Sequence, residues 1–343
     1  MKIREILRLL AVIALVLFML PSCVKEGPPG LDGANGKDGV DGVDGQDGQD
    51  GIVSCVACHN LTTRDAITSA WAVSKHGIGA TAARSSTASC APCHSHEGFV
   101  NSINNPGVAP VAISDASSIS CATCHTNHNS FDFENDGPDY ALRTNAAVKM
   151  IMYDDPTKVL DFQNSSNMCV NCHQSRPVSP ALAPDADRNY SIANYRFGPH
   201  HGPQGNLLEG VGGYELAGGV QYPGTKSHPH RKSTNACVTC HMHEGDHTFK
   251  ASLASCTDCH GTIDNFNVNS VQTEVHDLME ELAELLIEKG ALTDAKAIVA
   301  GTYPIEVAGA VYNWKTVEED RSMGVHNPAY IKALLTNSIE ALQ

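Results

Sequence analysis

The chain has 343 residues, of which 42% are hydrophobic and only 6% aromatic, and its formal net charge is −15 at pH 7. This length accommodates one large or two ordinary domains. The acidic balance argues against nucleic acid or an anionic lipid surface as a partner, because both carry charge of the same sign. It is compatible with steering of basic partners and with plain solubility.

Residues 1–22 are predicted to be an export signal. Basic residues precede an apolar run over residues 9–20, which fits the core of a signal peptide and is too short to span a bilayer. The run leads into Leu-Pro-Ser-Cys, ending at Cys23, which resembles a bacterial lipobox. The resemblance implies that Cys23 is lipidated and anchors the mature chain to a membrane; ordinary cleavage with a free thiol is the alternative. Val24, in place of an acidic residue, favours the outer membrane, on its periplasmic or cell-surface side.

Residues 27–50 repeat the pattern Gly-x-y in eight consecutive triplets. This is the period of collagen, so a triple helix that joins three chains is one interpretation. However, Pro is confined to the first triplet and Asp fills six of the y positions, so three aligned chains would repel one another. We therefore expect residues 23–51 to be a lipidated, extended tether that reaches about 75 Å at ~3.1 Å per residue. The trimer is kept as the alternative.

Residues 52–270 contain the pentapeptide Cys-x-x-Cys-His six times. Its cysteines are Cys55, Cys58, Cys90, Cys93, Cys121, Cys124, Cys169, Cys172, Cys237, Cys240, Cys256 and Cys259, and its histidines are His59, His94, His125, His173, His241 and His260. This is the attachment signal for haem c, in which both thiols bond to the haem vinyl groups and the histidine becomes the proximal iron ligand. Zinc ribbons and redox dithiols also use Cys-x-x-Cys, but neither requires histidine as the next residue. We therefore predict six haem c groups.

Six signals in residues 52–270 leave too little chain for six separate small domains. The haems are therefore expected to lie close together, with short helical turns and loops wrapped around them. Gly, Pro and Asn are frequent between the signals, for example in residues 104–107 and 199–205, which disfavours long elements. We expect a mainly α fold with much irregular loop and few or no strands.

Residues 271–343 lack cysteine and are predicted to be a helical segment that packs on the haem domain. Helical spacing of apolar residues starts at Val275, with Thr273 as the N-cap and Gly290 as the stop. A second helix is expected from about Ile305, after a break near residues 301–304. A third should begin at Pro328, after an Asn N-cap. Its inward-facing residues would be Ile331, Leu334, Leu335, Ser338 and Leu342.

Each signal histidine leaves one axial position on its iron, and eleven further histidines remain. Three segments resemble multihaem c-type cytochromes: Gly-Pro-His-His-Gly-Pro-Gln at 198–204, the fifth signal with the His-Thr-Phe that follows it at 237–249, and residues 312–330 around Val-His-Asn-Pro. That superfamily includes pentahaem nitrite reductase, hydroxylamine-oxidoreductase-like proteins and extracellular electron-transfer cytochromes. The resemblance covers about residues 52–343.

The resemblance and the local chemistry together predict six distal ligands, namely His76, His128, His200, His228, His247 and His326. His128 follows the third signal as Cys-x-x-Cys-His-x-x-His, an arrangement in which the second histidine serves a neighbouring haem. His200 is chosen over His201, and His228 over His230, with both alternatives open. His96 and His243 are reserves, and His276 is expected on a helix surface.

Closed axial positions and packed haems imply electron transfer to redox partner proteins or to a periplasmic or extracellular acceptor, with no catalytic side chain. The first alternative is a reductase or oxidoreductase of the nitrite or hydroxylamine type with one open haem. The Cys-x-x-Cys-Lys that often marks such a haem does not occur in this sequence. The second alternative is a subunit of a cytochrome filament.

Overall fold

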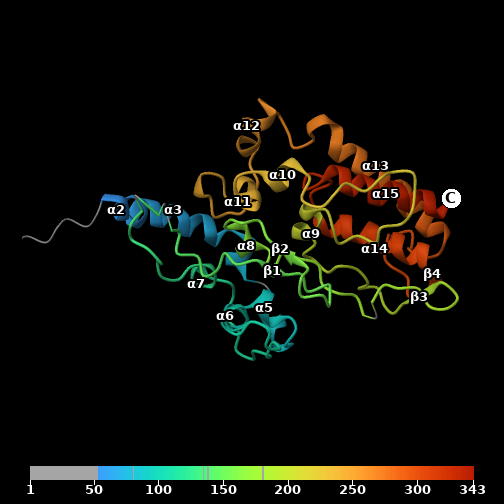
Figure 1. Ribbon diagram of the computed structural model, residues 1–343, viewed down its shortest axis with the longest axis horizontal. Coiled ribbons are helices and arrows are strands. Elements are labelled where there is room, and N and C mark those ends of the chain that lie inside the picture. The colour runs from blue at the N-terminus through green and yellow to red at the C-terminus, as the bar shows by residue number, and fades with distance from the viewer. Residues whose placement is uncertain (1–52, 80, 134, 137–138, 180) are drawn as a thin grey trace, which may run out of the picture. The chain divides into compact units, whose positions relative to one another are not determined.

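Short helices alternate with irregular chain up to residue 270, and three long helices form most of the remainder (Figure 1). The computed structural model describes residues 53–79, 81–133, 135–136, 139–179 and 181–343. The predicted export signal, Cys23 and the Gly-x-y run lie outside the described residues. The chain is mainly helical with much loop, as the sequence predicts. Among the described residues, no helix is long and apolar enough to cross a membrane.

The α-helices are α2 (Val53–His59), α3 (Leu61–Ala72), α4 (Lys75–Ile78), α5 (Ala91–His94), α6 (His96–Asn104), α7 (Cys121–Cys124), α8 (Ser166–Cys169), α9 (Gln204–Glu209), α10 (Pro229–Lys232), α11 (Ala236–His241), α12 (Thr257–His260), α13 (Val271–Glu288), α14 (Ile305–Asp320) and α15 (Pro328–Leu342). The strands are β1 (Val148–Lys149), β2 (Val159–Leu160), β3 (Asn189–Ile192) and β4 (Gly301–Pro304). They form two antiparallel pairs, β1 with β2 and β3 with β4.

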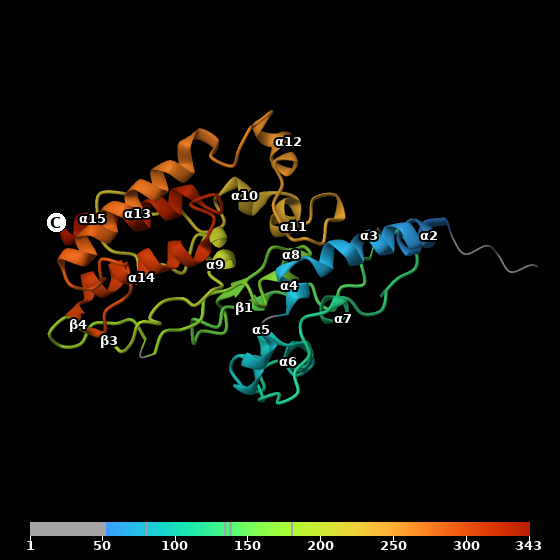
Figure 2. The ribbon, with the colours of Figure 1, turned by 180° about the vertical axis from the view of Figure 1, so that it is seen from behind.

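Helices α13, α14 and α15 pack together into a bundle, and both views place α10 to α12 next to it (Figures 1 and 2). The apolar stripe predicted from Val275 faces the bundle core, where Leu282 and Leu286 are fully buried. In α15, all five residues predicted to face inward are buried. The bundle core therefore accounts for most of the apolar burial that the side chains themselves supply.

The N-termini of α13 and α15 test the predicted caps. The N-cap of α15 is confirmed, because the side chain of Asn327 accepts a hydrogen bond from the N–H of Tyr330 (3.2 Å). The predicted N-cap of α13 is wrong: the helix begins at Val271, and Thr273 lies inside it. The side-chain oxygen of Asn267 accepts from the N–H groups of residues 272 and 273 instead, which satisfies two donors of the first turn that have no partner within the helix.

The β3–β4 pair connects the bundle to the part of the chain that carries the signals. Its register joins Asn189 to Pro304 and Ile192 to Gly301. Beside it, Arg188 pairs with Glu306, at 2.5 Å between Nη2 and Oε1, in the first turn of α14. The start of α14 is therefore fixed from the signal-bearing segment.

Candidate haem-binding site

Each Cys-x-x-Cys-His signal forms or borders one helical turn, in α2, α5, α7, α8, α11 and α12. Where the signal extends past the helix, the backbone keeps the same turn. The N–H of His125 donates to the carbonyl of Cys121 (2.9 Å), and the N–H of His173 donates to that of Cys169 (3.0 Å). Residues i, i+3 and i+4 of such a turn share one face, so the two cysteines and the histidine can meet one common ligand.

One continuous cavity of about 2560 Å³ runs along these turns. It is lined by all twelve cysteines and all six histidines of the signals, and by eight further histidines: His76, His128, His200, His201, His228, His230, His247 and His326. Ordinary ligand pockets reach only about 1,000 Å³. The cavity therefore has the size and the lining for several large apolar cofactors.

Every signal histidine faces one histidine from outside the signals. The pairs, with the distance between ring centroids, are His59–His128 (6.0 Å), His173–His76 (6.1 Å), His94–His200 (6.2 Å), His125–His247 (6.3 Å), His260–His230 (6.0 Å) and His241–His326 (6.3 Å). The six distances span only a narrow range, although the paired segments are unrelated in sequence position. A common requirement at all six places explains this uniformity.

The separation within the pairs fits an iron ion held between two imidazoles. An imidazole–metal bond is about 2.0 Å long, so two such bonds in line place the ring centroids about 6.2 Å apart. The neighbouring rings of His200 and His201, at 4.4 Å, and of His228 and His230, at 4.8 Å, are too close for an ion between them. Within the described part of the chain, no group of three or more His, Cys, Asp or Glu is placed to hold a metal ion. The arrangement is pairwise, unlike a four-ligand zinc site.

A comparison with solved structures found a cytochrome with a similar fold. The chain resembles the crystal structure of the outer cell wall cytochrome OcwA, with a TM-score of 0.51 and 19% sequence identity. The likeness covers 80% of this chain and 50% of that chain, so the present chain spans about half of its length. No family model and no curated protein matches the sequence. At this identity the likeness establishes a shared fold.

Backbone carbonyls orient several of the paired rings through Nδ1. His125 bonds to the carbonyl of Tyr140 (2.8 Å), His241 to that of Phe249 (3.0 Å), His247 to that of Gly245 (2.7 Å) and His230 to that of Val325 (2.6 Å). A carbonyl can only accept, so Nδ1 carries the proton in these rings. The lone pair is then on Nε2, the nitrogen free to bind a metal.

Burial favours the neutral form in several of the paired rings. It is the main cause that lowers the pKa of His76 to about 4 and that of His200 to about 4. It also lowers the pKa of His230 and His241. Neutral imidazole is the form that binds a metal ion, so this environment suits the candidate ligands.

His326 differs from these rings. Burial lowers its pKa, but the charge of Asp320 and the hydrogen bond to it outweigh burial, so the pKa lies above its usual value.

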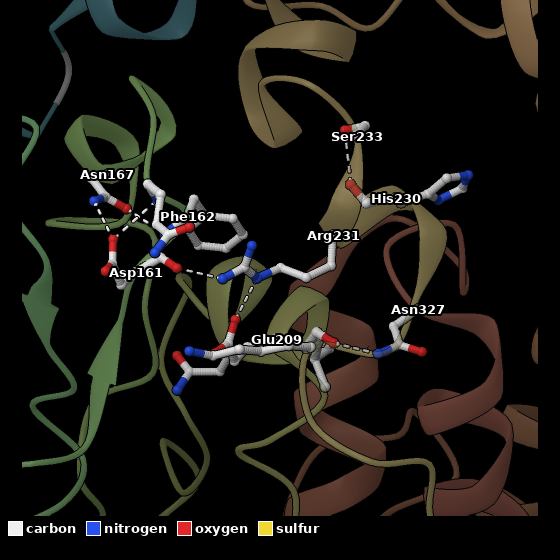
Figure 3. Close-up of polar contacts among 12 residues, drawn as sticks. Asp161, Phe162, Asn167, Glu209, His230, Arg231, Ser233 and Asn327 are labelled. Carbon is white, nitrogen blue, oxygen red and sulfur yellow. Dashed lines mark hydrogen bonds and ion pairs between the residues drawn. The ribbon is translucent and has the colours of Figure 1, made fainter.

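The structure places His230, and not the His228 chosen from the sequence, opposite His260. The reason lies in α10, where His228 is the N-cap and its Nδ1 accepts the N–H of His230 (3.3 Å). Arg231 is buried on the other side of this turn, with its Nε 2.5 Å from Oε2 of the buried Glu209. In Figure 3 the side chains of His230 and Arg231 leave the turn in opposite directions. The burial of Arg231 thus turns His230 toward the cavity.

Two further contacts hold Arg231 in place. Its Nη2 donates to the carbonyl of Asp161 (2.5 Å), and its guanidinium carbon lies 4.0 Å from the centre of the Phe162 ring (Figure 3). Asp161 in turn accepts from the amide of Asn167 (3.0 Å). These contacts tie α10 to the segment just before the fourth signal.

The second and fourth signals contact each other, and one thiol of each faces a backbone carbonyl of the other. The thiol of Cys93 points at the carbonyl of Asn171 (3.8 Å), and the thiol of Cys172 points at the carbonyl of Pro92 (3.8 Å). The second and fourth signals are thus direct neighbours.

The fourth signal also borders the fifth, and the fifth borders the sixth. Helix α8 of the fourth signal contacts α11 of the fifth, and the hydroxyl of Ser166 donates to the carbonyl of Asn235 (2.6 Å). The turn that carries Cys240 packs on the Leu253–Cys256 3-10 turn of the sixth signal. The fourth, fifth and sixth signals therefore follow one another in space as well as in sequence.

Phe249 contacts three of the ring pairs at once. Its ring centroid lies 4.7 Å from that of His76 and 5.8 Å from that of His247, while its carbonyl accepts from His241. Its backbone has a positive φ of 58°, which is unusual for an aromatic residue. The turn lets the carbonyl and the ring serve different pairs. The sequence indicated only that this residue follows His247.

The remaining histidines take other roles. His96 hydrogen-bonds through Nδ1 to the hydroxyl of Thr123 (3.0 Å), and His276 is exposed on α13. His201, whose ring lies beside that of His200, bonds through Nδ1 to Glu319 (2.7 Å). His243, in the short turn His243–Gly245, is partly buried outside the cavity lining.

Proposed function

We propose that the chain is a membrane-anchored c-type cytochrome that carries six haem c groups and transfers electrons through them to a periplasmic or extracellular acceptor. The six histidine pairs carry this proposal, because each would close one iron on both sides. The continuous cavity supports it further, since closely spaced cofactors are what an electron chain needs.

In this proposal each pair of signal cysteines holds one haem covalently, and the signal histidine is the proximal ligand. The distal ligands are His128, His76, His200, His247, His230 and His326, for the signals that contain His59, His173, His94, His125, His260 and His241 respectively. His230 thus replaces His228. When bound, haem c supplies one-electron transfer, and two histidine ligands favour a lower potential than histidine with methionine. The residues of the chain would position these groups, and two histidines at each iron would leave no coordination site for a substrate.

The location follows from the start of the sequence. A lipid on Cys23 would anchor the chain, and residues 24–51 would act as a tether from the outer membrane. The fold neighbour is described as an outer cell wall cytochrome, which agrees with a role at the cell surface. The acceptor is then a redox protein or a substance outside the cell.

Two measurements on the purified full-length protein test the function. Mass spectrometry should find six added haem groups, and electron paramagnetic resonance of the oxidised protein should show only low-spin ferric haem. A high-spin signal from about one haem in six would instead favour the reductase alternative. Fewer than six haems would overturn the assignment of the signals themselves.

The two assembly alternatives have their own tests. Sedimentation of the delipidated protein distinguishes a monomer from a trimer joined by the Gly-x-y run. Electron microscopy of the same sample would reveal filaments, if a filament is the functional form.

A further inference from the structure

A buried carboxylate is bonded to one of the twelve paired rings. Oδ1 of Asp320 lies 2.7 Å from Nδ1 of His326, and the side chain of Asp320 is 0% exposed. The hydroxyl of Ser322 donates to Oδ2 of Asp320 and accepts the backbone N–H of His326 (3.2 Å). Asp320, Ser322 and His326 thus form a small closed network at the end of α14.

The other paired rings have weaker partners. Four bond through Nδ1 to backbone carbonyls, and His173 lies 3.3 Å from the side-chain oxygen of Gln204. Nδ1 of His94 and of His128 has no hydrogen-bond partner, and the nearest carboxylate oxygen to His128, from Asp139, is 3.9 Å away. Among the described residues, His326 is therefore the paired ring that donates to a carboxylate.

This difference has an electronic consequence. A ring that donates Nδ1–H to a carboxylate becomes a more basic ligand at Nε2. A more basic ligand and a nearby negative charge both stabilise ferric over ferrous iron and so lower the reduction potential. Because Asp320 is shielded from water, its charge acts at low local dielectric and is poorly screened.

The backbone around His326 fixes the geometry of its contact with Asp320. Gly324 has a φ of 93° and packs against α13, where an added Cβ would lie 2.7 Å from Cγ2 of Val275. Arg321 and Met323 also have positive φ, at 61° and 48°. The loop thus holds His326 and Asp320 in one conformation, which the bundle imposes.

We propose that Asp320 is a positioning residue that makes the His241–His326 site the lowest in potential of the six. This inference rests on the proposed haem ligation. The fifth signal lies between the fourth and the sixth. Asp320 therefore sets how far the reduction potential of the fifth haem lies below the potentials of the fourth and sixth haems. Its effect is on the energetics of transfer along the chain, not on a substrate.

The test is spectroelectrochemical titration of the full-length, haem-loaded protein and of an Asp320→Asn variant. We expect the most negative component, about one sixth of the total absorbance change, to move to a more positive potential while the rest stays in place. The matched control is Glu319→Gln, which removes an adjacent buried carboxylate whose partners, His201, Lys315 and Arg321, belong to no pair. It should leave the most negative component unchanged. An Asp320→Asn titration identical to that of the wild type overturns the proposal, as does an equal shift caused by Glu319→Gln.

A second variant decides the matter if Asp320→Asn fails to assemble. Ser322→Ala removes the donor to Oδ2 and leaves more of the charge on the oxygen that faces His326. It should move the same component in the opposite direction, to a more negative potential, and no movement would refute the role of Asp320. The haem count and spin state of the wild type are measured in parallel. If these are not six and low-spin, the proposed function fails, and not only this inference.

Discussion

Arg231→Met tests whether the buried contacts of Arg231 fix the position of α10 and so orient His230 toward His260. The change keeps most of the apolar stem of the side chain but removes the charge that neutralises Glu209, which is 2% exposed. Breaking one partner of a buried ion pair costs about 3–5 kcal/mol. Lys226 remains 3.6 Å from Oε1 of Glu209, but this lysine is 54% exposed. A partly exposed pair contributes only about 0–1 kcal/mol, so we expect a loss of about 3 kcal/mol in the free energy of unfolding.

The double variant Arg231→Met/Glu209→Met separates the charge effect from packing. Replacing both ions by apolar groups of similar size is often nearly neutral, so it should lie within about 1–1.5 kcal/mol of the wild type. Guanidinium chloride unfolding, followed by far-ultraviolet circular dichroism, is measured for the haem-loaded wild type, the two single variants and the double variant. The four free energies of unfolding form a double-mutant cycle. A double variant as unstable as the sum of the single variants would show that the two charges are not coupled, and would refute the reasoning.

Three further predictions concern the candidate ligands and the anchor. His230→Ala should convert about one haem in six to high spin in electron paramagnetic resonance, whereas His228→Ala should leave all haems low-spin. The reverse result would identify His228 as the distal ligand. Phe249→Ala should alter the low-spin g-values of more than one haem, because the ring contacts two pairs, and a change confined to one haem would contradict that role. Cys23→Ser should move the protein from the membrane fraction to the soluble fraction after cell lysis, and retention in the membrane would rule out a lipid anchor at this residue.

The sequence was sufficient where the chemistry is local. The six signals are contiguous, so their helical turns follow from spacing alone. The stripe that begins at Val275 and the cap at Asn327 depend on neighbours within one or two turns, and both are present in the structure. The start of α13 cannot be placed from the local pattern, because its first N–H donors are satisfied by Asn267, which lies outside the expected cap position.

The choice between His228 and His230 could not be made from spacing. It depends on Arg231, whose partner Glu209 is 22 residues away in the chain. Asp320 and Phe249 likewise lie in segments that resemble multihaem cytochromes, but the sequence assigns neither of them a role in the site. Each acts through a contact set by packing of distant segments, and a lone Asp or Phe carries no signature of such a contact. Long-range packing therefore decides the parts of the site that the motifs leave open.

The histidine pairs also determine which distant parts of the chain would be cross-linked by bound haem. His230 and His260 are 30 residues apart, whereas His125 and His247 are 122 apart. If each pair is bridged through iron, every bridge closes a loop, as a disulfide does, and the closed loops overlap along the chain. Each doubling of loop length adds only about 0.6 kcal/mol to the entropic cost of closure, so the longest bridge costs about 1.2 kcal/mol more to close than the shortest. A chain with few aromatic residues would thus gain much of its order from cross-links that its cofactors make.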